Sequence, residues 1–372
     1  MQLIALLIQV VLLLWSSSFS TQNNNSYTSI FSFGDSFTDT GNFVIIGGPT
    51  TPNLLITNPP YGMTFFHHPT GRISDGRLAI DFIAEALGLP LLLPSTAANQ
   101  SFRQGANFAV AGATALNRTF FVQDGDTAVT PYNTSLTDQI GWFDAMKPSL
   151  CNSPQACRKY FAQALFFVGE FGWNDCCFML MAGKSVDELR SHVPQVVGTI
   201  SAAAEGRQQD GGDLGGVAAG VHAGNLVLYA SSNAADYEPE TGCLRDLNHL
   251  SRQHNSLLRQ AMARLGGRHP GVRIIYADFY APIADFAAAP GRYGFDAADG
   301  GLRSCCGGGG GRYNVDLAAM CGTPGVSACA DPAAFVNWDG VHLTEAANRR
   351  IADGCLRGPY AHPPILSASA RD

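Results

Sequence analysis

The sequence predicts an α/β domain in which a parallel sheet of about five strands is covered by helices on both faces. Short apolar runs recur along the chain, as expected for strands that are buried on both faces. These runs are SIFSFG (29–34), ANFAV (106–110), ALFFVG (164–169), NLVLYA (225–230) and VRIIYA (272–277). Longer segments with helical periodicity separate them, and this alternation favours a parallel sheet with crossover helices.

Two segments carry the clearest helix signals. The segment SDGRLAIDFIAEALG (74–88) has Ser74 or Asp75 as its expected N-cap, apolar residues at helical spacing, and Gly88 as its stop. The segment LRDLNHLSRQHNSLLRQAMARLGG (244–267) shows one apolar stripe and ends at a Gly-Gly pair. Both are expected to pack an apolar face against the sheet.

The composition predicts one globular domain. The chain has 372 residues, of which 46% are hydrophobic and only 14% charged, so it can bury a large core. Segments 45–70 and 117–135 are expected as surface loops, and the Ala/Gly-rich segment 201–224 as a frayed helix end followed by a loop. Because no linker divides the chain, we expect a single domain over residues 27–365.

The N-terminus predicts entry into the secretory pathway. Residues 1–20, MQLIALLIQVVLLLWSSSFS, contain an apolar run followed by small polar residues, which is typical of a cleaved signal peptide. The run is short for a membrane span, so no stable membrane insertion is expected after cleavage. An uncleaved anchor is the alternative, because Lys and Arg are missing before the apolar run.

Sequons and cysteines support the same route. Four Asn-X-Ser/Thr triplets are candidate glycosylation sites: Asn24, Asn99, Asn117 and Asn133. Ten cysteines in an oxidising compartment favour disulfides over free thiols. Cys151 and Cys157 are close enough to staple one loop, whereas the pairing of Cys305, Cys306 and Cys321 around CCGGGGGRYN stays open. A zinc site is the rival interpretation, but adjacent cysteine pairs such as those at 176–177 and 305–306 do not have metal-ligand spacing.

The charge balance limits the class of partner. The formal net charge is −7, and Lys and Arg form no cluster. Nucleic acid, anionic lipid surfaces and polyanionic glycans are therefore disfavoured as partners, and a neutral substrate is favoured.

Three predicted strand ends carry side chains or backbone groups suited to catalysis. Ser36 follows the first strand in FGDS, Gly112 follows the second, and Asn174 follows the third in GEFGWND. The carboxyl ends of parallel strands meet at one edge, where ligands bind. A hydroxyl, an accessible N–H and a side-chain amide match a nucleophile with oxyanion donors. Each residue alone has a plainer interpretation, since Gly-Asp-Ser is also ordinary turn chemistry.

The segment NWDGVHLTEAANRRIA supplies the base that a serine nucleophile needs. Asp339 and His342 precede a helix whose expected N-cap is Thr344. One tight turn can bring the carboxylate to the imidazole Nδ1 and leave Nε2 pointing outward.

With these residues in order, the chain resembles a plant-type member of the GDSL esterase/lipase family, within the SGNH hydrolases. FSFGDSFTDTGN, GANFAVAGATAL, VGEFGWND and DGVHLT resemble the four blocks of that family, and PTGRISDGRLAIDFIA (69–84) resembles a segment of its plant members. Phe37 stands where the family name has Leu. The resemblance implies a three-layer α/β/α, flavodoxin-like fold.

The resemblance also implies roles and an activity. The catalytic residues would be Ser36, Asp339 and His342, and the oxyanion donors Ser36, Gly112 and Asn174. The implied activity is hydrolysis of carboxylic esters without cofactor or metal. Our sequence-based hypothesis is a monomeric enzyme of the cell wall or Golgi that removes acetyl groups from a neutral polysaccharide such as xylan. An esterase of a small acylated metabolite or lipid, a transacylase and a non-catalytic glycan-binding protein are the alternatives.

Overall fold

A computed structural model describes residues 27–51, 53–123, 125, 133–208, 211–217 and 223–367. The strands are β1 (Ser29–Phe33), β2 (Gly105–Asn107), β3 (Ala164–Val168), β4 (Asp213–Val217), β5 (Ile274–Ala277) and β6 (Ala361–His362). They form one sheet in the order β2-β1-β3-β4-β5-β6. The first five run parallel, and β6 is an antiparallel edge on β5. The parallel sheet is confirmed, and its 2-1-3-4-5 order is the flavodoxin-like one.

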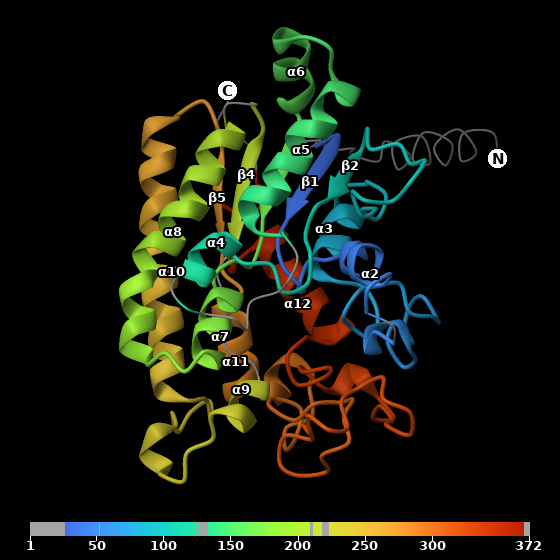
Figure 1. The fold of residues 1–372 in the computed structure, drawn as a ribbon, viewed down its shortest axis with the longest axis vertical. Coiled ribbons are helices and arrows are strands. Elements are labelled where there is room, and N and C mark those ends of the chain that lie inside the picture. Colours follow the sequence, from blue (N-terminus) through green and yellow to red (C-terminus); the bar gives the residue numbers. More distant parts are fainter. Residues whose placement is uncertain are drawn as a thin grey trace, which may run out of the picture.

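Helices cover both faces of this sheet (Figure 1). The α-helices are α2 (Asn42–Gly47), α3 (Ala79–Ala86), α4 (Arg118–Gln123), α5 (Leu136–Leu150), α6 (Pro154–Phe161), α7 (Trp173–Met181), α8 (Val186–Gln208), α9 (Ala223–Leu228), α10 (Arg245–Arg268), α11 (Tyr280–Ala288) and α12 (Glu345–Arg357). Short 3₁₀ turns are η1 (Leu55–Thr57), η2 (Ala234–Asp236), η3 (Pro290–Tyr293) and η4 (Pro332–Ala334).

The alternation of side chains along the strands sorts the core into two halves. Phe31 and Phe166 point to one face, where they pack with residues of α5, α8 and α10. Ile30, Leu165 and Phe167 point to the other face, where α3, α11 and α12 cover them. Successive strand side chains point to opposite faces, so fully apolar strands require a helical layer on each side. The result is a three-layer α/β/α sandwich.

The fourth strand differs from the sequence prediction. Residues 225–230 were expected as a strand, but the structure forms α9 over Ala223–Leu228. The strand is Asp213–Val217, inside the segment expected as a loop. Its sequence, DLGGV, has two glycines and lacks a strand pattern. Pairing with β3 on one side and β5 on the other makes it a strand.

The helix after residue 74 also begins later than expected. It starts at Ala79, with Leu78 at the N-cap position, and the Leu78 N–H donates to Asp81 Oδ2 at 2.9 Å. The expected caps serve α12 instead. Ser74 Oγ donates to the Leu343 carbonyl at 2.9 Å, and Asp75 Oδ1 accepts from the Glu345 N–H at 2.7 Å. Two other helix predictions agree with the structure. The predicted helix over 244–267 is α10, Arg245–Arg268, and the Thr344 side chain caps α12 as expected.

Six of the ten cysteines form disulfides. The pairs are Cys151–Cys157, Cys305–Cys329 and Cys306–Cys321, whereas Cys176, Cys177, Cys243 and Cys355 are free thiols. The expectation of disulfides is therefore right for these three pairs and wrong for the four free cysteines.

Three of the four sequons lie on the surface, at Asn99, Asn117 and Asn133. The fourth sequon, at Asn24, and the predicted signal peptide at 1–20 lie outside the described residues. Among the described helices, none is long and apolar enough to cross a membrane.

Candidate active site

Ser36 lies in a tight turn at the carboxyl end of β1. Asp35 builds this turn: its Oδ1 accepts from the Phe37 N–H at 3.0 Å, and its carbonyl accepts from the N–H groups of Thr38 and Asp39. Such side-chain-to-backbone bonds are typical of Asx turns. Both residues are buried, with Ser36 8% and Asp35 1% exposed. The turn therefore presents the hydroxyl at the sheet edge where ligands bind.

Asp39 and Asn42 hold the loops around this turn. Both Asp39 oxygens accept backbone N–H groups, from the start of α2 and from Ala111. The Asn42 amide donates to the carbonyls of Asn107 and Ala109. Both side chains are fully buried. Their contacts are those of scaffolding.

Asp339 and His342 form a hydrogen-bonded pair before α12. The His342 Nδ1 lies 3.0 Å from Asp339 Oδ1 and 2.9 Å from Oδ2. The backbone N–H groups of Val341 and His342 also donate to Oδ1. Burial raises the pKa of the Asp339 carboxyl, but the facing His342 and these hydrogen bonds outweigh it and lower the pKa to about 2. Asp339 is therefore an anion at any working pH.

Phe37 brings the Ser36 turn to His342. The rings of Phe37 and His342 lie 5.4 Å apart between centroids. The large apolar side chain at the position after Ser36 thus packs on the imidazole. Within the described residues, the hydrogen bonds of the His342 ring go to Asp339, and Ser36 Oγ and His342 Nε2 share none.

Two backbone N–H groups at this edge are unused. In the part of the chain that the structure describes, neither the Ser36 nor the Gly112 N–H donates to a protein acceptor. Gly112 has φ of +79°, and a Cβ at this position would meet no atom within 4 Å. The backbone conformation rather than crowding therefore requires glycine here. Free N–H groups beside open space suit an oxyanion.

Asn174 joins the two loops. Its Nδ2 donates to Asp35 Oδ2 at 3.1 Å and to the Ala113 carbonyl at 2.9 Å. Asn174 is the second residue of α7, which begins directly after β3 and Gly172. The structure thus brings together the Ser36, Gly112 and Asn174 segments, but both amide hydrogens already have acceptors.

Buried acids lie beneath the serine turn. Burial and the neighbouring Glu170 raise the pKa of Asp35 well above its usual range. Burial also raises the pKa of Asp175 to about 6, although its oxygens accept from Ala115 and Leu116 N–H groups. Glu170 accepts from Thr38 Oγ1 at 2.5 Å. These carboxyls fix the loops that carry the site rather than face solvent.

The segment resembling plant family members clamps α12. Arg77 pairs with Glu345, the first residue of α12, at 2.8 Å, and the Ala79 N–H donates to Asn348 Oδ1. Together with the Ser74 and Asp75 contacts, these bonds fix the helix that follows His342. Sequence reasoning missed this function, because nothing local in 69–84 indicates a partner so far along the chain.

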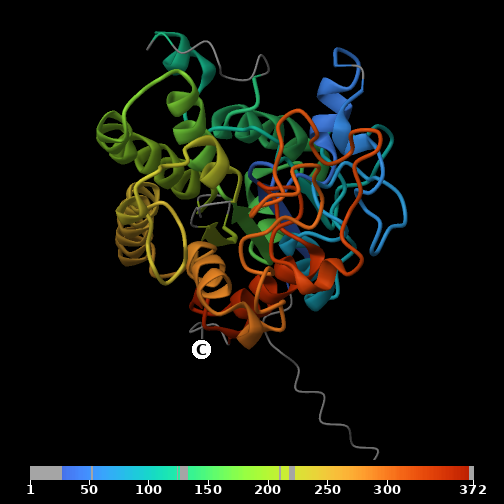
Figure 2. The same cartoon turned by 90° about the horizontal axis from the view of Figure 1, so that it is seen from below.

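The segment 305–329, which two disulfides brace, supports the other side of the Asp339 turn. We call it the disulfide-braced segment. The Cys305 and Cys306 N–H groups donate to the carbonyls of Asn337 and Trp338, and the Trp338 N–H donates to the His342 carbonyl. Seen from the carboxyl ends of the strands, this segment, in orange, lies beside the blue segments that follow β1 (Figure 2).

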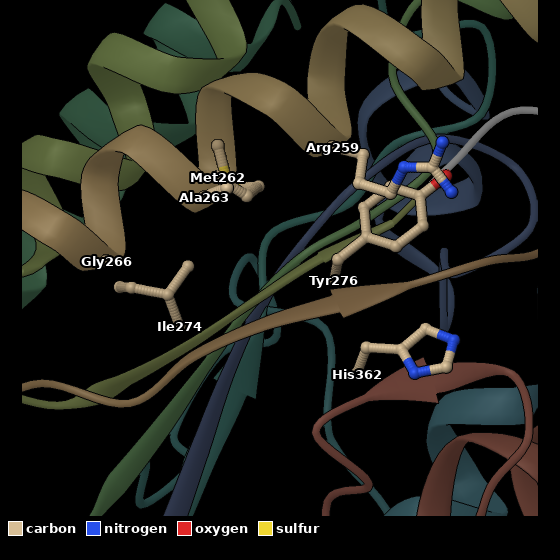
Figure 3. Close-up of a pocket in the computed structure, with 7 residues that line it drawn as sticks. All are labelled: Arg259, Met262, Ala263, Gly266, Ile274, Tyr276 and His362. Carbon is tan, nitrogen blue, oxygen red and sulfur yellow. The ribbon is translucent and has the colours of Figure 1, made fainter.

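A separate pocket of about 450 Å³ lies between α10 and β5 (Figure 3). Arg259, Tyr276 and His362 are its polar residues, and the rest of the lining is small or apolar. Neither serine nor cysteine is among the described residues that line it.

The comparisons with known proteins agree with this geometry. The family model described as GDSL-like Lipase/Acylhydrolase matches residues 30–354. The chain belongs to this family. A GDSL esterase/lipase of Arabidopsis thaliana is 45% identical over 361 residues, covering 95% of this chain and 88% of its own. Two others from that plant are 43% identical, covering 91% and 97% of this chain and 92% and 94% of their own.

Membership of the GDSL family makes the chain a serine esterase that acts on carboxylic ester bonds. The structure places the four blocks that resembled this family around one edge of the sheet.

Proposed function

We propose that this GDSL esterase cleaves esters through a Ser36–His342–Asp339 triad. The observation that carries the proposal is the hydrogen-bonded Asp339–His342 pair, whose imidazole packs on the residue next to Ser36. His342 Nε2 takes the Ser36 proton as Oγ attacks the ester carbonyl, and then gives that proton to the leaving alcohol. Water, activated by the same imidazole, attacks the acyl-serine and releases the acid.

The oxyanion that forms in both steps lies on the N–H groups of Ser36 and Gly112. Support comes from their lack of protein acceptors in the described residues and from the open space beside Gly112. Asn174 adds a third donor when the oxyanion replaces one of its present acceptors. Loss of one such donor typically costs about 10²–10³ in turnover.

The proposed substrate is a short acyl ester, acetyl first, on a neutral cell-wall polysaccharide such as xylan. The net charge of −7 opposes binding of a polyanion such as pectin and is indifferent to a neutral glycan. The predicted signal peptide and sequons favour the secretory route to the Golgi or cell wall, and the proposed enzyme acts there as a monomer. The exposed Asn99, Asn117 and Asn133 can accept glycans there.

One surface feature favours a second candidate, a small acylated metabolite. The aromatic loop YGMTFFHH (61–68) leaves Met63 and Phe65 each 40% exposed. Arg77 covers one face of the Phe65 ring at 3.8 Å. The same loop contacts Asp339 through Tyr61, so an exposed apolar surface lies near the site. Such a surface suits the flat ring of an aromatic ester.

Product analysis with purified secreted protein tests the proposal. We expect acetate from acetylated xylan, little from acetylated pectin, and falling rates on p-nitrophenyl esters as the acyl chain lengthens. Ser36→Ala should abolish every activity, and a fluorophosphonate probe should label Ser36. Ser149→Ala, on the exposed end of α5, is the matched control and should stay active.

Two results would contradict parts of this proposal. Full activity in Ser36→Ala would remove the nucleophile assignment. No acetate from xylan together with fast cleavage of a small phenolic ester would replace the polysaccharide by the metabolite and leave the triad intact.

A further inference from the structure

Tyr61 contacts the acid of the triad from a distant part of the sequence. Its hydroxyl donates to Asp339 Oδ2 at 2.9 Å. Oδ1 is held by backbone N–H groups of its own turn, whereas Oδ2 has only His342 Nδ1 and Tyr61 as partners among the described residues. Tyr61 thus donates to Oδ2 from outside the turn, and Oδ2 is the carboxylate oxygen closer to His342 Nδ1.

The surroundings fix the tyrosine in this position. Tyr61 is 3% exposed, and its ring meets the Trp338 ring edge-on at 5.9 Å between centroids. The Asn58 side chain ties the same loop to the Gly322 carbonyl in the disulfide-braced segment. Burial and the Asp339 charge raise the pKa of Tyr61, so the phenol keeps its proton and acts only as a donor.

We propose that Tyr61 is a positioning residue of the triad, which orients the Asp339 carboxylate toward His342 Nδ1 through its hydrogen bond to Oδ2. The inference rests on the proposed Ser36–His342–Asp339 mechanism. Without this donor, Oδ2 would keep only His342 Nδ1 as a partner among the described residues, and the carboxylate would be held chiefly through Oδ1. The donor also draws negative charge from Oδ2, which tempers the pull of Asp339 on the imidazolium.

Tyr61→Phe tests the proposal, because it removes the hydroxyl and keeps the ring. We expect kcat to fall about tenfold, the loss that removing one hydrogen bond to a charged group typically produces, with KM within about twofold. We also expect the acid limb of the kcat/KM profile to move to higher pH, because the charge on Oδ2 becomes more localised. A 3-fluorotyrosine at position 61 keeps fold and hydroxyl but donates more strongly, so it should move that limb to lower pH.

Tyr27→Phe is the matched control. The Tyr27 hydroxyl donates to Asp213 Oδ2 at 2.8 Å in an equally buried pair at the opposite, amino-terminal edge of the sheet. This variant should lose stability but keep kcat and its pH profile.

The outcomes separate two failures. If Asp339→Asn keeps normal turnover, the proposed triad fails. If Asp339→Asn is inactive while Tyr61→Phe matches Tyr27→Phe in kcat and pH profile, Tyr61 is only a packing residue and this inference alone is wrong. An unmoved acid limb in the fluorotyrosine protein would overturn it equally.

Discussion

Replacing Asp339 by asparagine tests the electrostatics of the site most directly. The asparagine keeps the size of the side chain and one carbonyl oxygen, but it removes the charge that faces His342. In the folded protein the pKa of Asp339 is lowered from 3.8 to about 2, and the favourable contributions come from His342 and the surrounding hydrogen bonds. This net shift corresponds to about 2 kcal/mol in favour of the ionised carboxylate, summed over burial, His342 and the backbone hydrogen bonds.

In the proposed mechanism, the charge of Asp339 also stabilises the imidazolium that forms in the transition state. Losing about 2 kcal/mol there slows the reaction ~30-fold. Asparagine can also donate to Nδ1 and so hold the wrong tautomer, for which the loss in serine proteases reaches ~10⁴. We therefore expect Asp339→Asn to lose between these two limits in kcat, with little change in KM.

The assay is kcat/KM on p-nitrophenyl acetate between pH 5 and 9, with thermal melting to confirm folding. Asp331→Asn is the control, since its carboxylate only accepts from the Ala333 N–H on an exposed 3₁₀ turn. A loss below tenfold in folded Asp339→Asn would refute the electrostatic reasoning, because the charge would then contribute less than about 1.4 kcal/mol to the transition state.

The remaining predictions concern the pH profile, the oxyanion donors and the disulfides. Because the pKa of Asp339 is depressed, its contribution to stability is present above about pH 4 and lost toward pH 2. The difference in unfolding free energy between wild type and Asp339→Asn should therefore shrink from pH 5 to pH 2, and an equal difference at both pH values would contradict this. Gly112→Ala, at φ +79°, should lower the free energy of unfolding by about 1–2 kcal/mol, measured by chemical denaturation, and should also lower kcat. An unchanged unfolding free energy and an unchanged kcat would argue against the N–H role. Asn174→Ala should lower kcat about 10²-fold, and a KM-only effect would contradict a transition-state donor. Reduction should lower both melting temperature and kcat. The double variant Cys151→Ala/Cys157→Ala should keep kcat, because that disulfide links the end of α5 to α6, away from the segment that precedes α12 (Figure 1). Equal losses in kcat would contradict the bracing role.

Local patterns were sufficient for the strands that carry the catalytic candidates. The apolar runs at 29–34 and 164–169 became β1 and β3, and the short spacing of Asp339 and His342 sufficed to predict their pairing in one turn. In both cases the decisive interactions lie within a few residues, so sequence spacing alone constrains them.

Long-range contacts could not be read in this way. β4 is a strand because two neighbours pair with it, while its glycine-rich sequence has no strand pattern. Ser74 and Asp75 look like helix caps, yet they bond residues near 343–345. Tyr61 contacts Asp339 across 278 positions. Tertiary packing decides such contacts, and a single sequence carries no local signal for them.

The present bonds of Asn174 indicate when the oxyanion site is completed. Its amide gives one hydrogen to the Asp35 carboxyl and the other to the neutral Ala113 carbonyl. A neutral ester oxygen would compete with that carbonyl on equal terms and gain little. A developing oxyanion forms charge-assisted bonds roughly twice as strong, so it can displace Ala113 while Asp35 keeps the amide in place. Asn174 would then contribute chiefly in the transition state, where an added interaction accelerates the reaction instead of only tightening substrate binding.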